Sequence, residues 1–382
     1  MKWILSALLL AAAIPRAGFA QAATTMATYY YLYVGTYTGP NSKGIHAFRY
    51  DAAQSALQPL GTVAELERPS FLALSPDRRF LYAVSELGND GKVEGAVYAY
   101  AIHPATGKLT FLNRQSSGGG GACHLVVDKL AKTLLVANYG TGSATSFALK
   151  PDGSIGDRVS KIQFEGSGPN AERQGGPHAH AVVLSPDNRF LFVPDLGTDH
   201  IHILSFDSSS GRLARSADVT VKPGAGPRHF TFSPDGRFAY LICEMGSLVV
   251  AYHYNSSTGA LTEIQTASTL PNGFTGENNS AEIETDSTGK FLYASNRGHD
   301  SIAVFSIDPS TGKLERRQIA PTQGRTPRNF TIDPTQRHLL AANQDSNKIV
   351  FFDRDLQTGK LTATGKTVDV PSPVCLLFTP AP

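Results

Sequence analysis

Cysteine is rare in this sequence: Cys123, Cys243 and Cys375 are the three copies among 382 residues, and none has a partner close by in the chain. An odd number of isolated cysteines builds neither a disulfide framework nor a cysteine-based zinc site. Each of the three stands within an apolar run. We therefore expect them to be small buried core residues.

The sequence also has no large excess of positive or of negative charge. Lys and Arg number 34 against 32 Asp and Glu, which leaves a net charge of +2. A protein that binds nucleic acid or an anionic membrane through its overall charge needs a far stronger basic field. We expect neither as a partner, and the 41% hydrophobic content is enough for a packed core.

No apolar stretch is long enough to cross a bilayer. The longest run, residues 4–14, follows Lys2 and precedes Gly18-Phe19-Ala20, whose small residues suit a cleavage site. This pattern predicts that residues 1–22 are a secretion signal and that residues 28–382 form the folded domain. The mature protein would then be periplasmic, with no stable membrane insertion. An uncleaved membrane anchor is the alternative for the same segment.

Two motifs of well-known chemistry are absent. There is no Gly-x-Ser-x-Gly elbow, so a covalent serine route has no support in the sequence. The four glycines at 118–121 are not followed by Lys-Ser or Lys-Thr, so they predict a loop rather than a phosphate cradle.

What is present is a repeat. A short aromatic and aliphatic segment, such as Phe80-Leu-Tyr-Ala-Val-Ser-Glu, recurs seven times at intervals of about fifty residues. A turn of the Ser-Pro-Asp type precedes most copies, and several are followed by a Thr-Gly turn. Strand-forming residues bounded by turn residues predict β-strands. The copies begin at Tyr31, Phe80, Thr133, Phe190, Phe238, Phe291 and His338.

Each repeat contains four strand patterns, which is typical of a propeller blade. The first copy lacks the strand that precedes the others, but residues 373–379 have the pattern of the strands that begin at Pro227 and Pro327. The sequence thus predicts an all-β, seven-bladed β-propeller with four-stranded blades. Its C-terminal strand would complete the N-terminal blade and remove a free edge. A solenoid would instead need atypical capping repeats.

Polar and charged side chains gather at equivalent positions of the repeats, where the first strand of a blade begins and where the second strand ends. Because these two strands are antiparallel, both sets should lie at one mouth of the central channel. His, Arg and Glu are seldom buried without partners, so this ring predicts a site. A structural network of hydrogen bonds is the alternative. The main candidates are His124, Asn138, His180, Arg228, His229, Glu244, Glu282, Asn296, Arg297 and Arg328, with Tyr139, Asp195, Asn329, Asn343 and Gln344 at equivalent positions.

This set of residues suits acyl transfer to water. A lactone carbonyl develops an oxyanion on attack, which fixed cationic donors such as Arg228, Arg297 and Arg328 would stabilise. His180 or Glu244 would take the proton from the attacking water. The residue types favour both alternatives for the base equally.

A metal site is a further possibility that the sequence does not complete. His178 and His180 stand two residues apart on an extended segment, and Glu244 or Glu282 would be a third ligand. No local motif completes the coordination, and several nearby arginines oppose a divalent cation. We therefore expect no metal.

Several stretches of the chain resemble the lactonase family of seven-bladed propellers. The resemblance covers nearly the whole chain after the signal segment. It implies a hydrolase of the 6-phosphogluconolactonase type that opens a sugar-derived lactone without a metal or organic cofactor. The phosphorylated lactone is a cytoplasmic metabolite, so the signal segment leaves the choice of lactone open. The most specific stretches begin at Gly175 (GGPHAH), Phe192 (FVPDLG), Gly226 (GPRHF), Gly276 (GENNSAEI) and Leu292 (LYASNRGHDSIAVF).

The sequence is also similar to the fungal muconate cycloisomerase propellers, which form or open a lactone ring. Motif by motif, this resemblance implies a catalytic set of His180, Arg228, Glu244 and Arg297. Two alternatives stay open: a cycloisomerase that acts on a muconate-like diacid, and a non-catalytic binding propeller. The residues expected to bind substrate are His124, Asn138, His178, His229, Glu282, Asn296 and Arg328.

Overall fold

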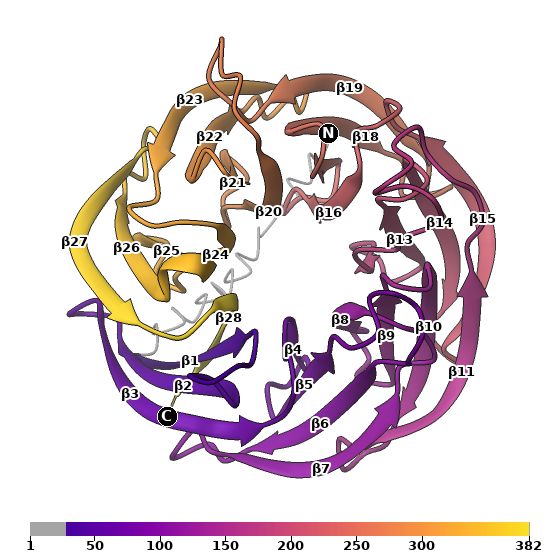
Figure 1. The fold of residues 1–382 in the computed structure, drawn as a ribbon, viewed down its shortest axis with the longest axis horizontal. Helices are drawn as coiled ribbons and strands as arrows, with labels where there is room; N and C mark the ends of the chain where they lie inside the picture. Colours follow the sequence, from indigo (N-terminus) through magenta and orange to yellow (C-terminus); the bar gives the residue numbers. More distant parts are fainter. Residues whose placement is uncertain (1–27, 382) are drawn as a thin grey trace, which may run out of the picture.

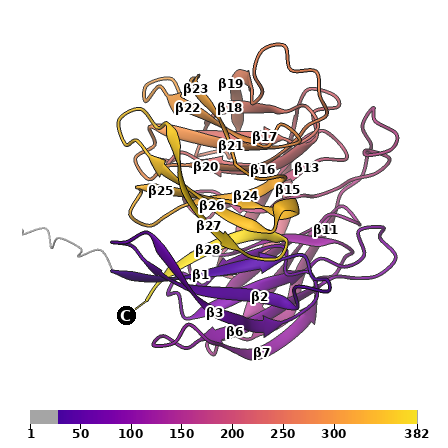
Figure 2. The same ribbon diagram turned by 60° about the vertical axis from the view of Figure 1, so that its left-hand side comes forward.

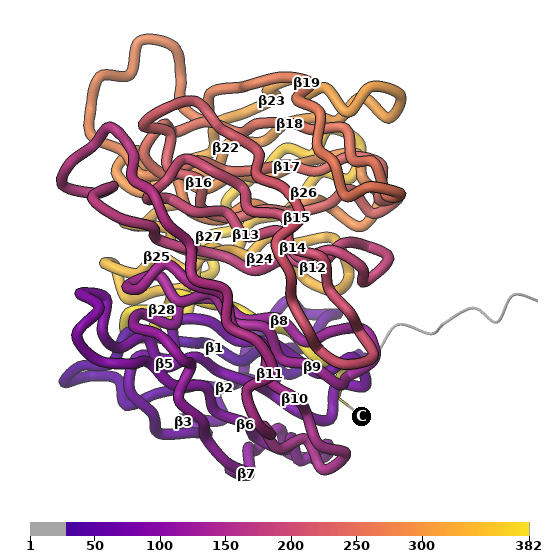
Figure 3. The backbone as a smooth tube through the Cα atoms, turned by 90° about the vertical axis from the view of Figure 1, so that its right-hand side faces the viewer, coloured from indigo at the N-terminus to yellow at the C-terminus, as the bar shows by residue number. Residues whose placement is uncertain are grey.

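The computed structural model describes residues 28–381, which form seven four-stranded antiparallel sheets arranged as blades around a central channel (Figure 1). Seen from the side, loops and hairpins project at both rims of the ring (Figure 3). The predicted seven-bladed β-propeller is confirmed. The expected signal segment, residues 1–22, lies outside the described residues.

The blades follow one another in chain order, and the innermost strand of each comes first in the chain except in blade 1. Blade 1 contains β28 (Pro373–Pro380), β1 (Tyr29–Thr36), β2 (Gly44–Asp51) and β3 (Ala56–Glu65), and blade 2 contains β4 (Leu72–Leu74), β5 (Phe80–Ser85), β6 (Ala96–Ile102) and β7 (Leu109–Ser116). Blade 3 contains β8 (Ala122–Val127), β9 (Thr133–Asn138), β10 (Ser143–Leu149) and β11 (Ile155–Gln163), and blade 4 contains β12 (Val183–Leu184), β13 (Phe190–Asp195), β14 (His200–Asp207) and β15 (Arg212–Thr220). Blade 5 contains β16 (Pro227–Phe232), β17 (Phe238–Cys243), β18 (Leu248–Tyr254) and β19 (Leu261–Ser268), and blade 6 contains β20 (Asn279–Thr285), β21 (Phe291–Arg297), β22 (Ser301–Ile307) and β23 (Leu314–Pro321). Blade 7 contains β24 (Pro327–Ile332), β25 (His338–Asn343), the 3-10 turn η1 (Gln344–Ser346), β26 (Lys348–Arg354) and β27 (Leu361–Asp369).

The two ends of the chain close the ring in blade 1. The C-terminal strand β28 lies beside β1, with Leu32 opposite Phe378 and Val34 opposite Leu376 (Figure 2). This pairing covers the inner edge of β1 with backbone hydrogen bonds and leaves no open gap between the first and last blades. The predicted completion of the N-terminal blade by the C-terminal strand is confirmed.

Apolar layers between neighbouring blades form the core. On β17, Ala239, Leu241 and Cys243 pack against blade 4, whereas Tyr240 and Ile242 pack against blade 6. Successive side chains of a strand point to opposite faces, and here both faces are covered, so the second strands are almost wholly apolar. All three cysteines are free and buried, as expected.

The Thr-Gly hairpins of blades 2, 5, 6 and 7 each pack against an aromatic ring of the preceding blade. A Cβ atom at Gly312 of blade 6 would lie 2.4 Å from the ring of Phe238 in blade 5, and Gly312 has a φ of +71°. The buried Tyr240 hydroxyl donates to the Gly312 carbonyl over 3.2 Å. The aromatic residue that begins one repeat therefore packs against the turn glycine of the next blade. The glycine has no side chain, which leaves room for the ring.

Candidate active site

In six of the seven blades, the same backbone contact fixes the position of one residue near the mouth of the channel. It is the seventh residue of the repeated segment, directly after the second strand. In six blades its N–H donates to the carbonyl of the residue that closes the turn before the first strand. The bonds are Tyr37–Ser372 (3.1 Å), Glu86–Arg68 (3.1 Å), Tyr139–Gly121 (2.8 Å), Leu196–His178 (3.0 Å), Glu244–Gly226 (2.7 Å) and Gln344–Thr326 (2.9 Å).

In blades 3, 5 and 7 an irregularity of the first strand directs a second residue into the site. The pairing register shifts between Ala122 and His124, between Pro227 and His229, and between Pro327 and Asn329. Such a bulge inserts one extra residue and re-aims its side chain. The extra residues are Cys123, Arg228 and Arg328. In blade 4 the strand is broken at this place, and the His180 N–H instead donates to the Pro194 carbonyl over 2.9 Å.

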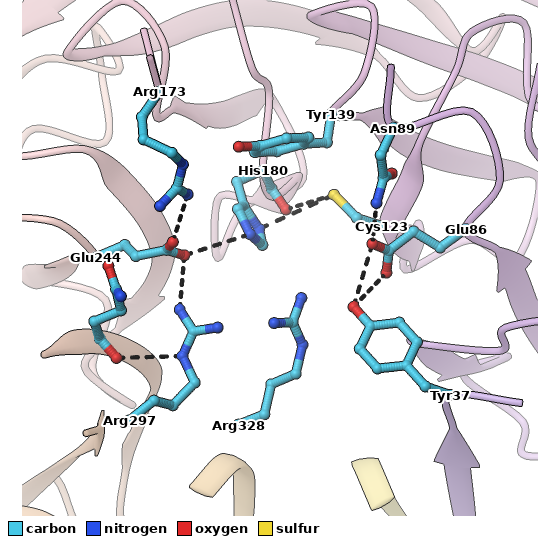
Figure 4. A pocket seen from close by; sticks show the side chains of 11 residues that line it. Tyr37, Glu86, Asn89, Cys123, Tyr139, Arg173, His180, Glu244, Arg297 and Arg328 are labelled. Carbon is cyan, nitrogen blue, oxygen red and sulfur yellow. Dashed lines mark hydrogen bonds and ion pairs between the residues drawn. The ribbon is translucent and has the colours of Figure 1, made fainter. Parts of the chain in front are cut away.

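The two sets meet around a cavity of about 330 Å³ at one mouth of the channel (Figure 4). Five of its lining residues hold the seventh position of their repeat, and four come from the starts of first strands. The lining consists of Tyr37, Glu86, Asn89, Cys123, Tyr139, Arg173, His180, Glu244, Asn279, Arg297 and Arg328.

On one side of this cavity, three arginines surround the carboxylate of Glu244. Its carboxylate accepts hydrogen bonds from Arg173 (2.7 Å) and Arg228 (3.1 Å) and lies 2.9 Å from Nη2 of Arg297. Burial alone would raise the pKa of Glu244, but Arg297, Arg228 and then Arg173 outweigh burial and hold it well below its usual range. Glu244 is therefore an ionised carboxylate that holds three guanidinium groups together.

Arg228 lies one layer below the cavity. Its side chain is almost fully buried, and it donates both to Glu244 and, over 2.7 Å, to the Ala281 carbonyl. Burial, then the positive charges of Arg297 and Arg328, lower the pKa of Arg228 to about 10. The group remains a cation at neutral pH, and the lowered pKa reflects its burial and then the positive charges beside it.

His180 reaches the cavity between these cations. Its Nε2 lies 3.9 Å from Glu244, which is too long for a hydrogen bond, and its imidazole stands edge-on to the rings of Tyr139 and His229. Burial, then Arg228, His229 and Arg328, hold the pKa of His180 well below its usual value. The imidazole is neutral at neutral pH and can accept a proton.

The opposite wall of the cavity combines a carboxylate, a phenol and a further arginine. The Glu86 carboxylate accepts a hydrogen bond from the Tyr37 hydroxyl over 3.0 Å and another from the Asn89 amide over 2.9 Å. The Arg328 guanidinium stands over the Tyr37 ring at 5.2 Å. Within residues 28–381, no group accepts a hydrogen bond from the Arg328 side chain, so its donors are directed at the cavity.

A polar layer supports the floor of the site. His229 lies 2.9 Å from Glu282 through Nδ1, and the Asn329 amide donates to the same carboxylate over 2.5 Å. His124 packs against Phe71 with the ring centroids 4.0 Å apart. These residues contact the cavity residues from below rather than lining the cavity itself.

The structure brings together most of the residues that the sequence predicted for the site, in two layers. His180, Glu244, Arg297 and Arg328 line the cavity, and the other members lie beneath it or beside it. Arg228, His229 and Glu282 line a small hollow below the cavity, and His124 packs in the same layer.

Three of the residues predicted for catalysis or substrate binding belong to neither layer. The Asn138 amide donates to the Ser117 carbonyl and to Ser143, and the Asn296 amide donates to Thr269 and Ser301, so both complete the ends of strands. His178 stacks on Tyr139 at 4.4 Å and lies 2.9 Å from the Tyr139 carbonyl through Nδ1. The asparagines are the sixth residues of their repeats, and adjacent residues of a strand point to opposite sides.

Sequence reasoning missed Tyr37, Glu86, Asn89, Arg173 and Asn279. The first two hold the seventh position of the repeat, and comparison of that position alone would have found them. Arg173 lies in the loop between β11 and β12, which has no counterpart in the other blades, so nothing in the repeat indicates its role. Cys123, which was expected in the core, is buried there and also lines the cavity.

Within residues 28–381, no three His, Cys, Asp or Glu side chains come together as metal ligands. Nor does any helix in that range have the length and apolarity that a membrane crossing requires.

Comparison with known proteins gives matches along nearly the whole folded chain. The family described as Lactonase, 7-bladed beta-propeller matches residues 31–378. A 6-phosphogluconolactonase of Bacillus subtilis is 38% identical over 351 residues, which cover 92% of this chain and 99% of the relative. One of Formosa agariphila is also 38% identical, over 80% of this chain and 86% of the relative. The solved structure of a periplasmic gluconolactonase of Pseudomonas aeruginosa has 34% identity and a TM-score of 0.87, covering 93% of this chain and 100% of that one.

Proposed function

Because the chain belongs to the seven-bladed lactonase propeller family, as a 6-phosphogluconolactonase-like hydrolase, we propose that it opens a sugar-derived lactone by adding water to the ring carbonyl at the cavity described above. One observation carries the proposal: a neutral imidazole and the ionised Glu244 share a cavity with guanidinium groups. Attack on a lactone needs a proton acceptor and a positive field for the developing oxyanion.

Arg297 and Arg328 are the donors for the oxyanion in this proposal. Both line the cavity, and they come from the neighbouring blades 6 and 7. Because their guanidinium groups are held in place before the reaction, they stabilise the new charge without reorganisation at the moment of attack. Arg228 supports them from below by holding Glu244.

His180 is the proton carrier. Its neutral imidazole accepts a proton from the attacking water and returns it to the ring oxygen when the C–O bond breaks. Glu244 is not free to take up the proton, because Arg173, Arg228 and Arg297 already occupy its carboxylate oxygens. Burial also raises the pKa of the Cys123 thiol, so this residue stays protonated and does not act as the nucleophile.

The substrate class is a cyclic ester of an aldonic acid, with or without a phosphate group. The curated relatives include 6-phosphogluconolactonases, and a structural relative is a periplasmic gluconolactonase. The N-terminal pattern supports export through residues 1–22. We propose that the mature enzyme works in the periplasm.

Initial rates on a panel of phosphorylated and plain aldonolactones test this function, after correction for spontaneous ring opening. The wild-type protein should accelerate the opening of at least one aldonolactone, with and without a chelator. A His180→Ala protein prepared in the same way controls for a contaminating lactonase. Turnover of a muconate lactone alone would favour the cycloisomerase alternative, and turnover of no lactone would favour a binding propeller.

A further inference from the structure

A second, much smaller hollow lies directly under the cavity. Its volume is about 10 Å³, which is about the least that can hold one water molecule. Glu86, Cys123, His180 and Arg328 line both the hollow and the cavity, so the two spaces adjoin. The remaining lining is Ser70, Phe71, Arg228, His229, Glu282 and Val374.

Ser70 is the feature of this hollow that the site described so far does not use. Its side chain is 5% exposed, and its hydroxyl has no hydrogen-bond partner within residues 28–381. A buried hydroxyl without a partner costs free energy unless a ligand or a water molecule bonds to it. Ser70 holds the position in blade 2 that Arg228 and Arg328 hold in blades 5 and 7, directly after a proline.

We propose that this hollow seats the water molecule that attacks the lactone, with Ser70 Oγ as its anchor and His180 as its proton acceptor. The proposal rests on the lactonase function and adds the origin of the nucleophile. Each of the three groups that such a water needs is on the lining: a hydroxyl to fix it, an imidazole to deprotonate it and guanidinium donors to orient it. A water so confined has the two to four polar partners that buried waters have.

The reaction balances with these groups alone. The water oxygen forms a bond to the carbonyl carbon while one water proton passes to the His180 imidazole. The tetrahedral intermediate then breaks its bond to the ring oxygen, which takes the proton back from His180. The product is an open-chain hydroxy acid, which ionises and releases one proton to solvent.

The test is a series of substitutions at Ser70, assayed with glucono-1,5-lactone and its 6-phosphate. Ser70→Val places two methyl groups in the hollow and should lower kcat at least 100-fold with KM within threefold of wild type. Ser70→Gly leaves room for a second water in place of the hydroxyl and should keep kcat within tenfold. The matched control is Ser146→Ala in β10, where a buried serine donates to the Gly211 carbonyl remote from the site; its kcat should not change.

A high-resolution crystal structure of the wild-type protein gives a readout that does not depend on activity or on the folding of a variant. We expect one water within hydrogen-bond distance of Ser70 Oγ, in line with His180. No water at this place would overturn the proposal, as would a folded Ser70→Val protein whose kcat is within threefold of wild type. A large rise in KM at unchanged kcat would also overturn it, because the hollow would then hold part of the substrate. Wild-type protein that opens no lactone contradicts the proposed function instead.

Discussion

Nη2 of Arg297 in blade 6 lies 2.9 Å from Oε2 of Glu244 in blade 5, and both side chains are largely buried. Neither blade alone holds this pair, since each contributes one charge at the end of its second strand. The contact joins two repeats and pre-orients a guanidinium for the cavity.

Removal of the shared carboxylate should destabilise the protein. In Glu244→Ala the buried cations Arg228 and Arg297 lose their common counter-ion, which costs about 3–5 kcal/mol in comparable buried pairs. Urea unfolding at neutral pH measures the change. The control is Glu172→Ala, an exposed carboxylate in the loop that carries Arg173, which should change the free energy of unfolding by less than about 0.5 kcal/mol. A loss below about 1 kcal/mol in Glu244→Ala would contradict the picture of a central counter-ion.

Loss of the positive charge of Arg328 should reduce activity but not stability. The Arg328→Met protein keeps most of the apolar part of the side chain and loses a guanidinium that donates no hydrogen bond to any described residue. We expect kcat to fall about 100-fold or more, as for the loss of one oxyanion donor, with an unchanged urea midpoint. Arg325→Met, three residues earlier and exposed, is the control. A destabilised protein with near-normal kcat would assign Arg328 to the framework.

The pH dependence of turnover should report the depressed pKa of His180. The base works in its unprotonated form, so kcat/KM is lost as the pH falls through the folded-state pKa, which lies well below 6.5. We expect a plateau across neutral pH and an acid limb well below pH 6.5, measured after correction for spontaneous opening. His180→Gln should lose most of the turnover, whereas His253→Gln, an exposed residue near the end of β18, should not. A half-maximal rate near pH 6.5 would show a base of ordinary pKa.

Glu284 should make the folded protein less stable as the pH rises, which is opposite to the usual effect of a carboxyl group in a folded protein. Burial, then the neighbouring Glu282, raises the pKa of Glu284 from 4.5 to about 8. A carboxyl group with a raised folded-state pKa is protonated in the folded protein while it is ionised in the unfolded chain. Its stabilising contribution is therefore present below pH 4.5 and is lost as the pH rises toward 8.

The Glu284→Gln protein carries a permanently neutral group at that position. We expect it to be more stable than wild type by a few kcal/mol at pH 8, with the difference shrinking toward pH 5. Urea unfolding at the two pH values measures this. A difference of equal size at both pH values would reveal a packing effect instead of a titration.

Much of the fold is readable in the chain because its interactions are local. Every strand of the repeat has its own apolar run or its own alternation of apolar and polar residues, and turn residues mark its ends. The number of strands and the number of blades therefore follow from the pattern. The closing strand is also visible, since residues 373–379 match the strands that begin at Pro227 and Pro327. The site was predictable in outline, because charged residues at equivalent places of a ring must meet at one mouth.

The sequence by itself determined that seven similar sheets form and that arginine, histidine and glutamate gather at one end of their channel. Only the tertiary structure decided which of these residues reach the cavity. A bulge puts Arg228 in the floor and Arg328 in the wall, strand alternation separates Asn138 from Tyr139, and a loop with no counterpart carries Arg173 to Glu244. These outcomes depend on contacts between groups that are far apart in the chain, and a repeat pattern records only what lies within one blade.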